Sequence, residues 1–169
     1  MNVKRLNGIL QMLFDEMNAL TNEGKELPVL WDVMHLYSSL QIAKILAMKR
    51  GLNSELAAIA AAFHDIGVVV TKKTNNHAQN AEKYIREIIR CYNENITNDH
   101  LQITKEEYEI IINAVLKHSE VETFSDDLYV ELLKDVDSFD KYLHGIDTNE
   151  YCIIRSKKVI EELGLNSTV

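Results

Sequence analysis

The sequence predicts an all-α protein, folded as a single-domain bundle of about six or seven helices. Apolar residues recur at helical spacing in nearly every segment. One proline and six glycines are too few to supply the turns that a fold with many strands needs. The 169 residues and the apolar fraction of 46% suit one compact domain with its own core. Because no repeat, low-complexity tract or linker divides the chain, we expect residues 1–169 to form one domain.

The first two helices are predicted from apolar spacing and from the single proline. One face of the first helix carries an apolar stripe of Leu6, Leu10, Leu13 and Met17. Pro28 favours a second helix start, since its fixed φ suits the first turn. That second helix, over residues 29–48, is apolar nearly all round, so we expect it to be central. Gly51 is expected to end it.

The third helix should lead directly to the most unusual stretch of the chain. Asn53 or Ser54 can cap its start. It is expected to run to about Ile66, with Gly67 as its C-terminal stop. The following VVVTKKTNN has no clear pattern, and its valines at 68–70 are also compatible with a short strand.

Apolar stripes and capping residues predict four further helices in the second half of the chain. The one over 77–92 has a stripe of Ala81, Ile85, Ile88 and Tyr92. TKEE at 104–107 is a capping box that opens a helix to about His118. Ser125 or Asp126 should begin the next helix, which ends near Gly145. Thr148 precedes a last helix that ends at Gly164.

Charge and composition narrow the class of protein. The net charge of −8 disfavours long nucleic acid as a partner. We find no apolar run that should span a bilayer, and the start of the chain does not resemble a secretory signal, so neither membrane association nor export is expected. Cys91 and Cys152 lie far apart in segments that look helical, which favours two reduced thiols and a cytoplasmic location.

His64 and Asp65 stand side by side where the apolar third helix ends. Burying two titratable groups there is costly unless something pairs with them. The alanine-rich turns before them, at 57–58 and 60–62, would let an ion or another helix approach closely. The alternative is a histidine favoured by the helix dipole beside a solvated aspartate. The stretch alone leaves both interpretations open.

Three further histidines are predicted to face inward from three other helices: His35, His77 and His118. Any one of them could be a hydrogen-bonded core histidine. Together with His64 they would bury four imidazoles, whose donors and acceptors all need partners. A shared metal ion satisfies them at once. His100 lies in a polar loop and His144 precedes Gly145 at a helix end, so neither is assigned as a ligand.

A metal site would also need a second carboxylate, and DVDSFD at 135–140 offers three. The buried face of this helix is marked by Leu133, Val136, Phe139 and Leu143. Asp137 borders that face, one turn after Leu133, and is our first choice. Asp140 is the alternative, and Asp135 is expected to point further toward solvent. All three could instead be solvated surface acids.

The order His35, then His64–Asp65, then Asp137 resembles the HD superfamily of metal-dependent phosphohydrolases. HDIG followed by His77, then NAVLKHSE, then DVDSFD is similar to the branch that carries two extra histidines. The resemblance covers about residues 30–143. Many relatives have a lysine directly after HDIG, where this chain has Val68. Lys72 and Lys73 follow slightly later and could supply positive charge at the rim of the site; the alternative is that both are solvated lysines of a polar loop.

The resemblance implies a ligand set and a reaction. The first metal would take His35, His64, Asp65 and Asp137, and Asp65 would bridge to a second metal held by His77 and His118. Such nitrogen and oxygen donors suit iron, manganese, cobalt, nickel or zinc, in one or two ions. Asp65, Lys72 and Lys73 are then the expected catalytic residues. The implied reaction is hydrolysis of a small phosphorylated molecule, which could be a nucleotide.

Two other functions remain open at the level of sequence. Myo-inositol oxygenase and its relatives resemble the same six-ligand order but use a mixed-valent di-iron centre that activates oxygen. Some HD-like domains are catalytically silent, metal-stabilised regulatory modules. The presence of all six ligand residues argues against such a loss of activity. Neither the substrate nor the oligomeric state can be read from the sequence.

Overall fold

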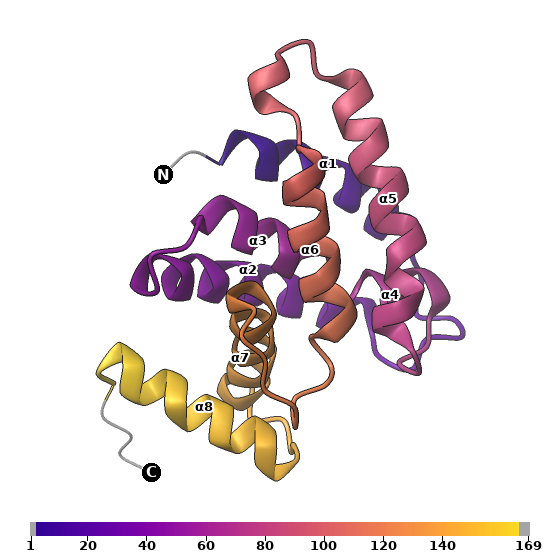
Figure 1. Cartoon of the computed structure of the whole chain (residues 1–169). Coiled ribbons are helices and arrows are strands. Elements are labelled where there is room, and N and C mark those ends of the chain that lie inside the picture. The colour runs from indigo at the N-terminus through magenta and orange to yellow at the C-terminus, as the bar shows by residue number, and fades with distance from the viewer. Residues whose placement is uncertain (1–2, 166–169) are drawn as a thin grey trace.

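The computed structural model describes residues 3–165, and within them the protein contains helices and no strand. The elements are α1 (Lys4–Asn18), α2 (Val29–Lys49), α3 (Ser54–Phe63), α4 (Ile66–Thr71), α5 (His77–Asn95), the 3-10 helix η1 (Asp99–Leu101), α6 (Lys105–Lys117), α7 (Leu128–Leu143) and α8 (Glu150–Leu163) (Figure 1). The all-α prediction is confirmed. The short α4 is an addition to the seven helices that the sequence patterns indicated.

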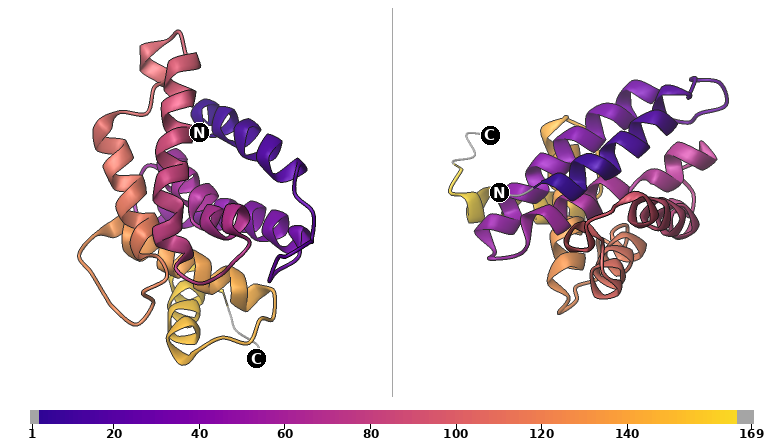
Figure 2. Two further views of the ribbon diagram at one scale, coloured as in Figure 1. Left: turned by 90° about the vertical axis from the view of Figure 1, so that its right-hand side faces the viewer. Right: turned by 90° about the horizontal axis from the view of Figure 1, so that it is seen from above.

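Helix α3 lies at the centre of the fold. Its residues from Glu55 to Phe63 are all buried, and it packs against α1, α2, α6 and α7. Its alanines allow this, because small side chains let several helix backbones approach closely. Helix α1 covers α3 and α5 from one side (Figure 2). The predicted central helix, α2, instead leaves Leu30 and Met48 largely exposed, with fractions of 68% and 57%.

The expected end of α3 at Gly67 was wrong. The helix ends at Phe63, the chain turns through His64 and Asp65, and α4 begins at Ile66. Gly67 lies inside α4, and the valines at 68–70 are helical rather than a strand. A Cβ atom on Gly67 would lie 1.9 Å from the backbone oxygen of His77. The glycine is therefore required for α4 to pack against the first turn of α5.

The helix starts follow local side-chain chemistry. Asn53 caps α3, and its side chain accepts hydrogen bonds from the Glu55 and Leu56 amides at 3.0 and 3.1 Å. The capping box of α6 has both of its hydrogen bonds, between Thr104 and Glu107. Two other starts are displaced by one or two residues from the prediction: Asp127 caps α7, and Asn149 caps α8.

Asp135 is fully buried, which contradicts the expectation that it points toward solvent. Helix α8 packs on α7 and covers it. Arg155 of α8 donates to Asp135 at 2.8 Å, and Arg50 donates to it at 2.7 Å. Arg155 also donates to the carbonyls of Val121 and Thr123. This buried ion pair therefore fixes the loop between α6 and α7.

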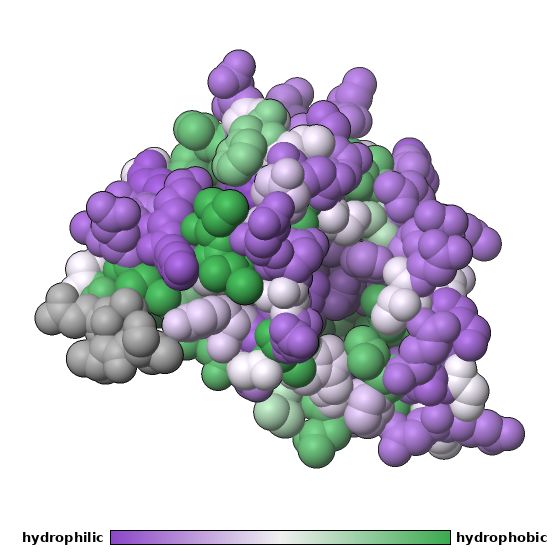
Figure 3. Space-filling view, turned by 90° about the horizontal axis from the view of Figure 1, so that it is seen from below, coloured by the Kyte–Doolittle hydropathy of each residue, from purple (hydrophilic) through white to green (hydrophobic). Residues whose placement is uncertain are grey.

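The stretch Ser54–Thr71 is long and apolar enough to cross a membrane, although the sequence was expected to contain no such run. It comprises α3 and α4 with a turn between them, and 78% of it is buried inside the protein. That is the pattern of a core helix rather than of a membrane span. On the face seen from below, hydrophilic side chains surround separate hydrophobic patches (Figure 3).

Replacing Gly67 by alanine tests the close approach of α4 and α5. The added methyl group would overlap backbone, which cannot rotate away, so we expect the variant to lose about 1–3 kcal/mol of unfolding free energy. Gly8→Ala is the comparison variant: there the added Cβ would meet side-chain atoms of the buried Tyr92 ring rather than backbone, so we expect a smaller loss. Urea denaturation measures both. A Gly67→Ala variant as stable as the wild type would contradict the packing described here.

Candidate metal centre

The six predicted metal ligands come together in the structure, although they belong to different helices. The contributing positions are His35 in α2, His64 and Asp65 in the turn between α3 and α4, His77 at the start of α5, His118 at the end of α6, and Asp137 in α7. His35, His64 and Asp137 offer donor atoms within 4.8 Å of one another, and so do His64, Asp65 and His118. Their assignment as ligands remains a prediction.

Each of the four imidazoles uses its Nδ1 atom to contact an oxygen outside the cluster. His64 and His118 contact the backbone oxygens of Ala61 and Val115, both at 2.6 Å. His77 contacts the backbone oxygen of Thr74 at 2.8 Å. Because a carbonyl oxygen can only accept, Nδ1 carries the proton in these three rings. In a neutral ring the Nε2 atom then presents a lone pair, and it is the Nε2 atoms that face the cluster.

The Nε2 atoms meet in two close pairs. Those of His35 and His64 lie 2.9 Å apart, and those of His77 and His118 lie 3.0 Å apart. Two lone pairs at this distance repel unless a proton or a metal ion lies near both. Two ligands roughly 2.1 Å from one ion are separated by about 3.0–3.4 Å at right or tetrahedral angles. The observed separations therefore fit nitrogen ligands that share an ion.

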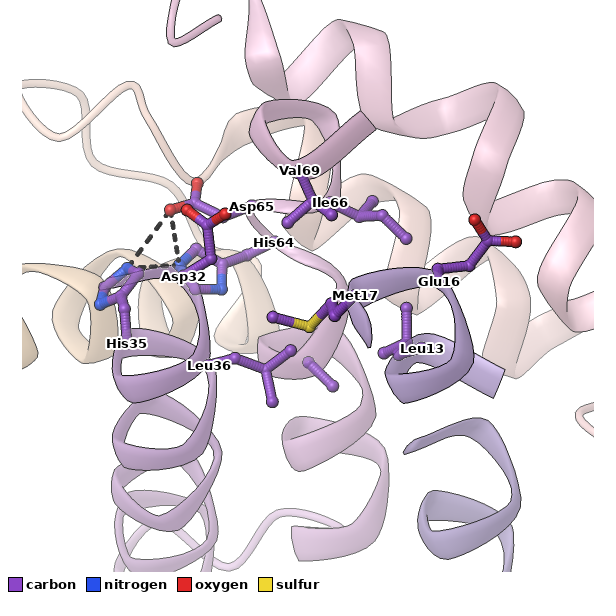
Figure 4. A pocket seen from close by; sticks show the side chains of 11 residues that line it. Leu13, Glu16, Met17, Asp32, His35, Leu36, His64, Asp65, Ile66 and Val69 are labelled. Atoms are coloured by element: carbon purple, nitrogen blue, oxygen red, sulfur yellow. Dashed lines mark hydrogen bonds and ion pairs between the residues drawn. The ribbon is translucent and has the colours of Figure 1, made fainter. Parts of the chain in front are cut away.

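Asp65 lies between the two pairs and turns one oxygen toward each. Figure 4 shows its contacts with His35 and His64. Its Oδ2 is 3.4 Å from the Nε2 of His35 and 3.6 Å from that of His64. Its Oδ1 is 3.2 Å from the Nε2 of His77 and 3.6 Å from that of His118. The Asp65 side chain is 27% exposed, so the centre is open to solvent at this point. One carboxylate can thus serve two ions.

Asp137 adds a second carboxylate to the His35–His64 pair. Its Oδ1 is 3.2 Å from the Nε2 of His35 and 3.6 Å from that of His64. This oxygen is buried and has no hydrogen-bond donor among the described residues. A buried carboxylate oxygen without a donor is costly. The donor set therefore fits a cation, and it contains only the nitrogen and oxygen atoms that first-row divalent metals accept.

The carboxylates around the four imidazoles favour a positive charge at the centre of the cluster. Burial lowers the pKa of His35, but the carboxylates of Asp137, Asp140 and Asp65 outweigh it and raise the pKa to about 11. Burial raises the pKa of Asp65, yet the neighbouring histidines hold it well below its usual range. Burial and the nearby His118 lower the pKa of His77, which keeps this ring neutral and its Nε2 free. Without a metal, a proton on His35 supplies the charge that the carboxylates require.

The family model of the HD domain matches residues 33–142 of this chain, which is more than half of its length and includes all six positions. The chain belongs to the HD-domain family. The matched range includes the adjacent His64 and Asp65. No curated protein and no solved structure is similar enough to this chain to count as a match.

Two further residues contact His35, and the sequence analysis assigned no role to one of them, Trp31. Asp140, the alternative ligand, accepts from the Nδ1 of His35 at 2.5 Å and so faces away from the Nε2 cluster. It orients His35, as outer carboxylates commonly do for metal-bound histidines. Trp31 stacks on the His35 ring, with centroids 5.1 Å apart. The signal for Trp31 was its position one helical turn before His35.

Lys141 is a second residue that the sequence analysis missed. It lies one turn after Asp137 and donates to its Oδ2 at 2.7 Å. Burial lowers the pKa of Lys141, but the charges of Asp137 and Asp65 raise it well above its usual value, so the ammonium stays charged. The i,i+4 spacing was the signal that would have found it.

The two lysines expected at the rim make their contacts elsewhere. Lys72 donates to the backbone oxygen of Glu23 at 2.8 Å, and Lys73 pairs with Glu26 at 3.5 Å. Both contacts are with the segment between α1 and α2. The described contacts of the two lysines include none of the six predicted ligands. Their catalytic role stays a prediction.

Of the two histidines that were not assigned as ligands, only His100 lies apart from the centre. It belongs to η1, beside the start of α3 and Arg5. His144 caps the C-terminus of α7, as its position before Gly145 suggested. Its Nε2 is also 3.6 Å from Asp140 and 3.3 Å from the Ser38 hydroxyl. His100 is therefore the cleaner control position.

A narrow pocket of about 20 Å³ adjoins the centre beside His35, His64 and Asp65 (Figure 4). Its other walls are mainly apolar and consist of Leu13, Met17, Leu36, Ala62, Ile66 and Val69, together with Glu16 and Asp32. Asp32 forms a buried ion pair with Lys25, at 2.6 Å. The pocket holds about one water molecule, so a larger ligand could reach the centre only from the exposed side of Asp65.

Removing one histidine of the second pair tests the two-ion arrangement. In His77→Ala, we expect one of two bound ions to be lost, because His118 and one oxygen of Asp65 are then the only predicted ligands left for it. Elemental analysis of protein loaded with manganese and freed of excess metal measures the count. His100→Ala should bind as many ions as the wild type. Two tightly held ions in His77→Ala would show that the second site is assigned wrongly.

Proposed function

We propose that this HD-domain protein is a cytoplasmic, metal-dependent phosphohydrolase that acts on a small phosphorylated molecule, which could be a nucleotide. The observation that carries this proposal is the position of Asp65, with one carboxylate oxygen toward each pair of histidine Nε2 atoms. Two-ion centres of this kind are well suited to displacement at phosphorus, because both the attacking and the leaving oxygen need stabilisation.

The first ion would be held by His35, His64, Asp65 and Asp137, and the second by Asp65, His77 and His118. When bound, divalent ions lower the pKa of a coordinated water toward neutrality and neutralise negative charge on phosphoryl oxygens. The protein holds the ligands in position for this. Asp140 and the backbone oxygens of Ala61, Thr74 and Val115 fix the four imidazoles with Nε2 inward.

The electrostatics support an anionic substrate despite the net charge of −8. Two divalent ions would bring four positive charges to a cluster whose own acids are Asp65, Asp137 and Asp140, and so reverse the local field. Lys72 and Lys73 remain proposed contributors of positive charge at the rim. To reach substrate they would have to exchange their present contacts with Glu23 and Glu26.

The accessible side of the centre favours a small substrate. Asp65 and His77 are exposed by 27% and 21%, whereas His35, His64 and His118 are almost fully buried. A phosphate group at the end of a small molecule can reach such a site. Long nucleic acid is disfavoured by the acidic surface, which would repel its backbone.

The same six donors also fit a di-iron oxygenase of the myo-inositol oxygenase type. The two functions differ in measurable ways. An oxygenase should purify with iron and consume oxygen with a polyol or phosphonate, whereas the proposed hydrolase should release phosphate without oxygen. A silent regulatory module would do neither, and chelator would leave its melting temperature unchanged if no metal stabilises it.

Turnover by metal-loaded protein tests the proposed function. With manganese, nickel or cobalt, we expect release of phosphate from an aryl phosphate or from members of a nucleotide panel. Asp65→Ala should reduce the rate by more than about 100-fold, since it removes ligands from both ions. His100→Ala should match the wild type. Absence of turnover with every metal and substrate would contradict the proposal, as would an Asp65→Ala variant that remains active.

A further inference from the structure

The two oxygens of Asp137 have different surroundings, although they belong to one carboxylate. Oδ1 faces the Nε2 atoms of His35 and His64 and has no donor among the described residues. Oδ2 accepts a hydrogen bond from the ammonium of Lys141 at 2.7 Å. Only 4% of the Asp137 side chain is exposed, so solvent cannot supply an alternative partner for Oδ2.

The contact with Lys141 is built into α7. The two residues are spaced i,i+4, so the helix itself holds the ammonium beside Asp137. A hydrogen bond between two charged groups is short and among the stronger kinds that proteins form. It also resists rotation of the carboxylate about its own axis, because turning would break this bond inside a buried site.

From this geometry we infer that Lys141 is a positioning residue that restricts Asp137 to metal binding through Oδ1 alone. The inference rests on the proposed metal site. A carboxylate can bind an ion through one oxygen or through both. With Oδ2 engaged by Lys141, an ion held by His35 and His64 would keep one coordination position free. That position would then be available to water or to a phosphoryl oxygen.

Removal of the lysine has a consequence that a purely stabilising ion pair would not have. In Lys141→Met the side chain keeps its length but cannot donate, so Asp137 is free to bind through both oxygens. Metal affinity should then be maintained or increased, while the number of water molecules on the ion falls by one. The value of kcat should fall by about 10- to 100-fold, as for other residues that orient metal ligands. KM should change much less.

The decisive readout is the number of water molecules on bound Mn²⁺, measured by electron paramagnetic resonance in ¹⁷O-enriched water. Affinity is measured by competition with a chromophoric chelator. We expect one water fewer in Lys141→Met than in the wild type, with affinity at least as high. Lys141→Arg keeps a donor for Oδ2 and should restore the wild-type water count.

Lys158→Met is the matched control, because Lys158 also forms an ion pair with an aspartate of α7, Asp135, but has no described contact with the metal ligands. It should change neither the water count nor the affinity. If Lys141→Met does not fold, Lys141→Ala removes the same donor and carries the same expectation. An unchanged water count, or affinity and activity that fall together, would overturn the inference. Because the water count needs no substrate, it decides the inference even if no phosphohydrolase activity is found.

Discussion

Four imidazole Nε2 atoms and two carboxylates are confined to one small region of this protein, and that crowding is the constraint on which the rest depends. Each imidazole forms a hydrogen bond through Nδ1 with an oxygen outside the cluster. None can turn its Nε2 away without losing this hydrogen bond. The Nε2 atoms of each pair lie 2.9 or 3.0 Å apart. Such an arrangement is stable only with a positive charge among the donors.

The fold can be understood as the means of holding this cluster together. The alanines of α3 admit the surrounding helices, and Gly67 admits the start of α5, which carries His77. Asp135 and Arg155 fix the loop that follows His118. These features lie outside the ligand set, yet each of them determines where a ligand is placed.

Helical apolar spacing was sufficient to predict the all-α class, and the ordered pattern of histidines and aspartates selected residues that lie together in the structure. Asp137 was preferred over Asp140 from the buried stripe of one helix, and the structure places only Asp137 beside the Nε2 atoms. Predictions from the local sequence were wrong where contacts with a helix distant in the sequence determine the burial or the conformation of a residue. Asp135 was expected to be solvated because its ion-pair partners, Arg155 and Arg50, lie far from it in the sequence. Gly67 appeared to be a stop because its true neighbour, the His77 carbonyl, is brought to it by tertiary packing.

The central claim is that two metal ions lie on either side of Asp65, and anomalous X-ray scattering tests it most directly. Crystals of manganese-loaded protein, measured above and below the metal absorption edge, should show two anomalous peaks. One should lie among His35, His64 and Asp137 and the other beside His77 and His118, separated by about 3.5–4 Å as in other two-metal sites. Crystals without an anomalous peak beside Asp65, or with metal only at surface carboxylates, would contradict the account.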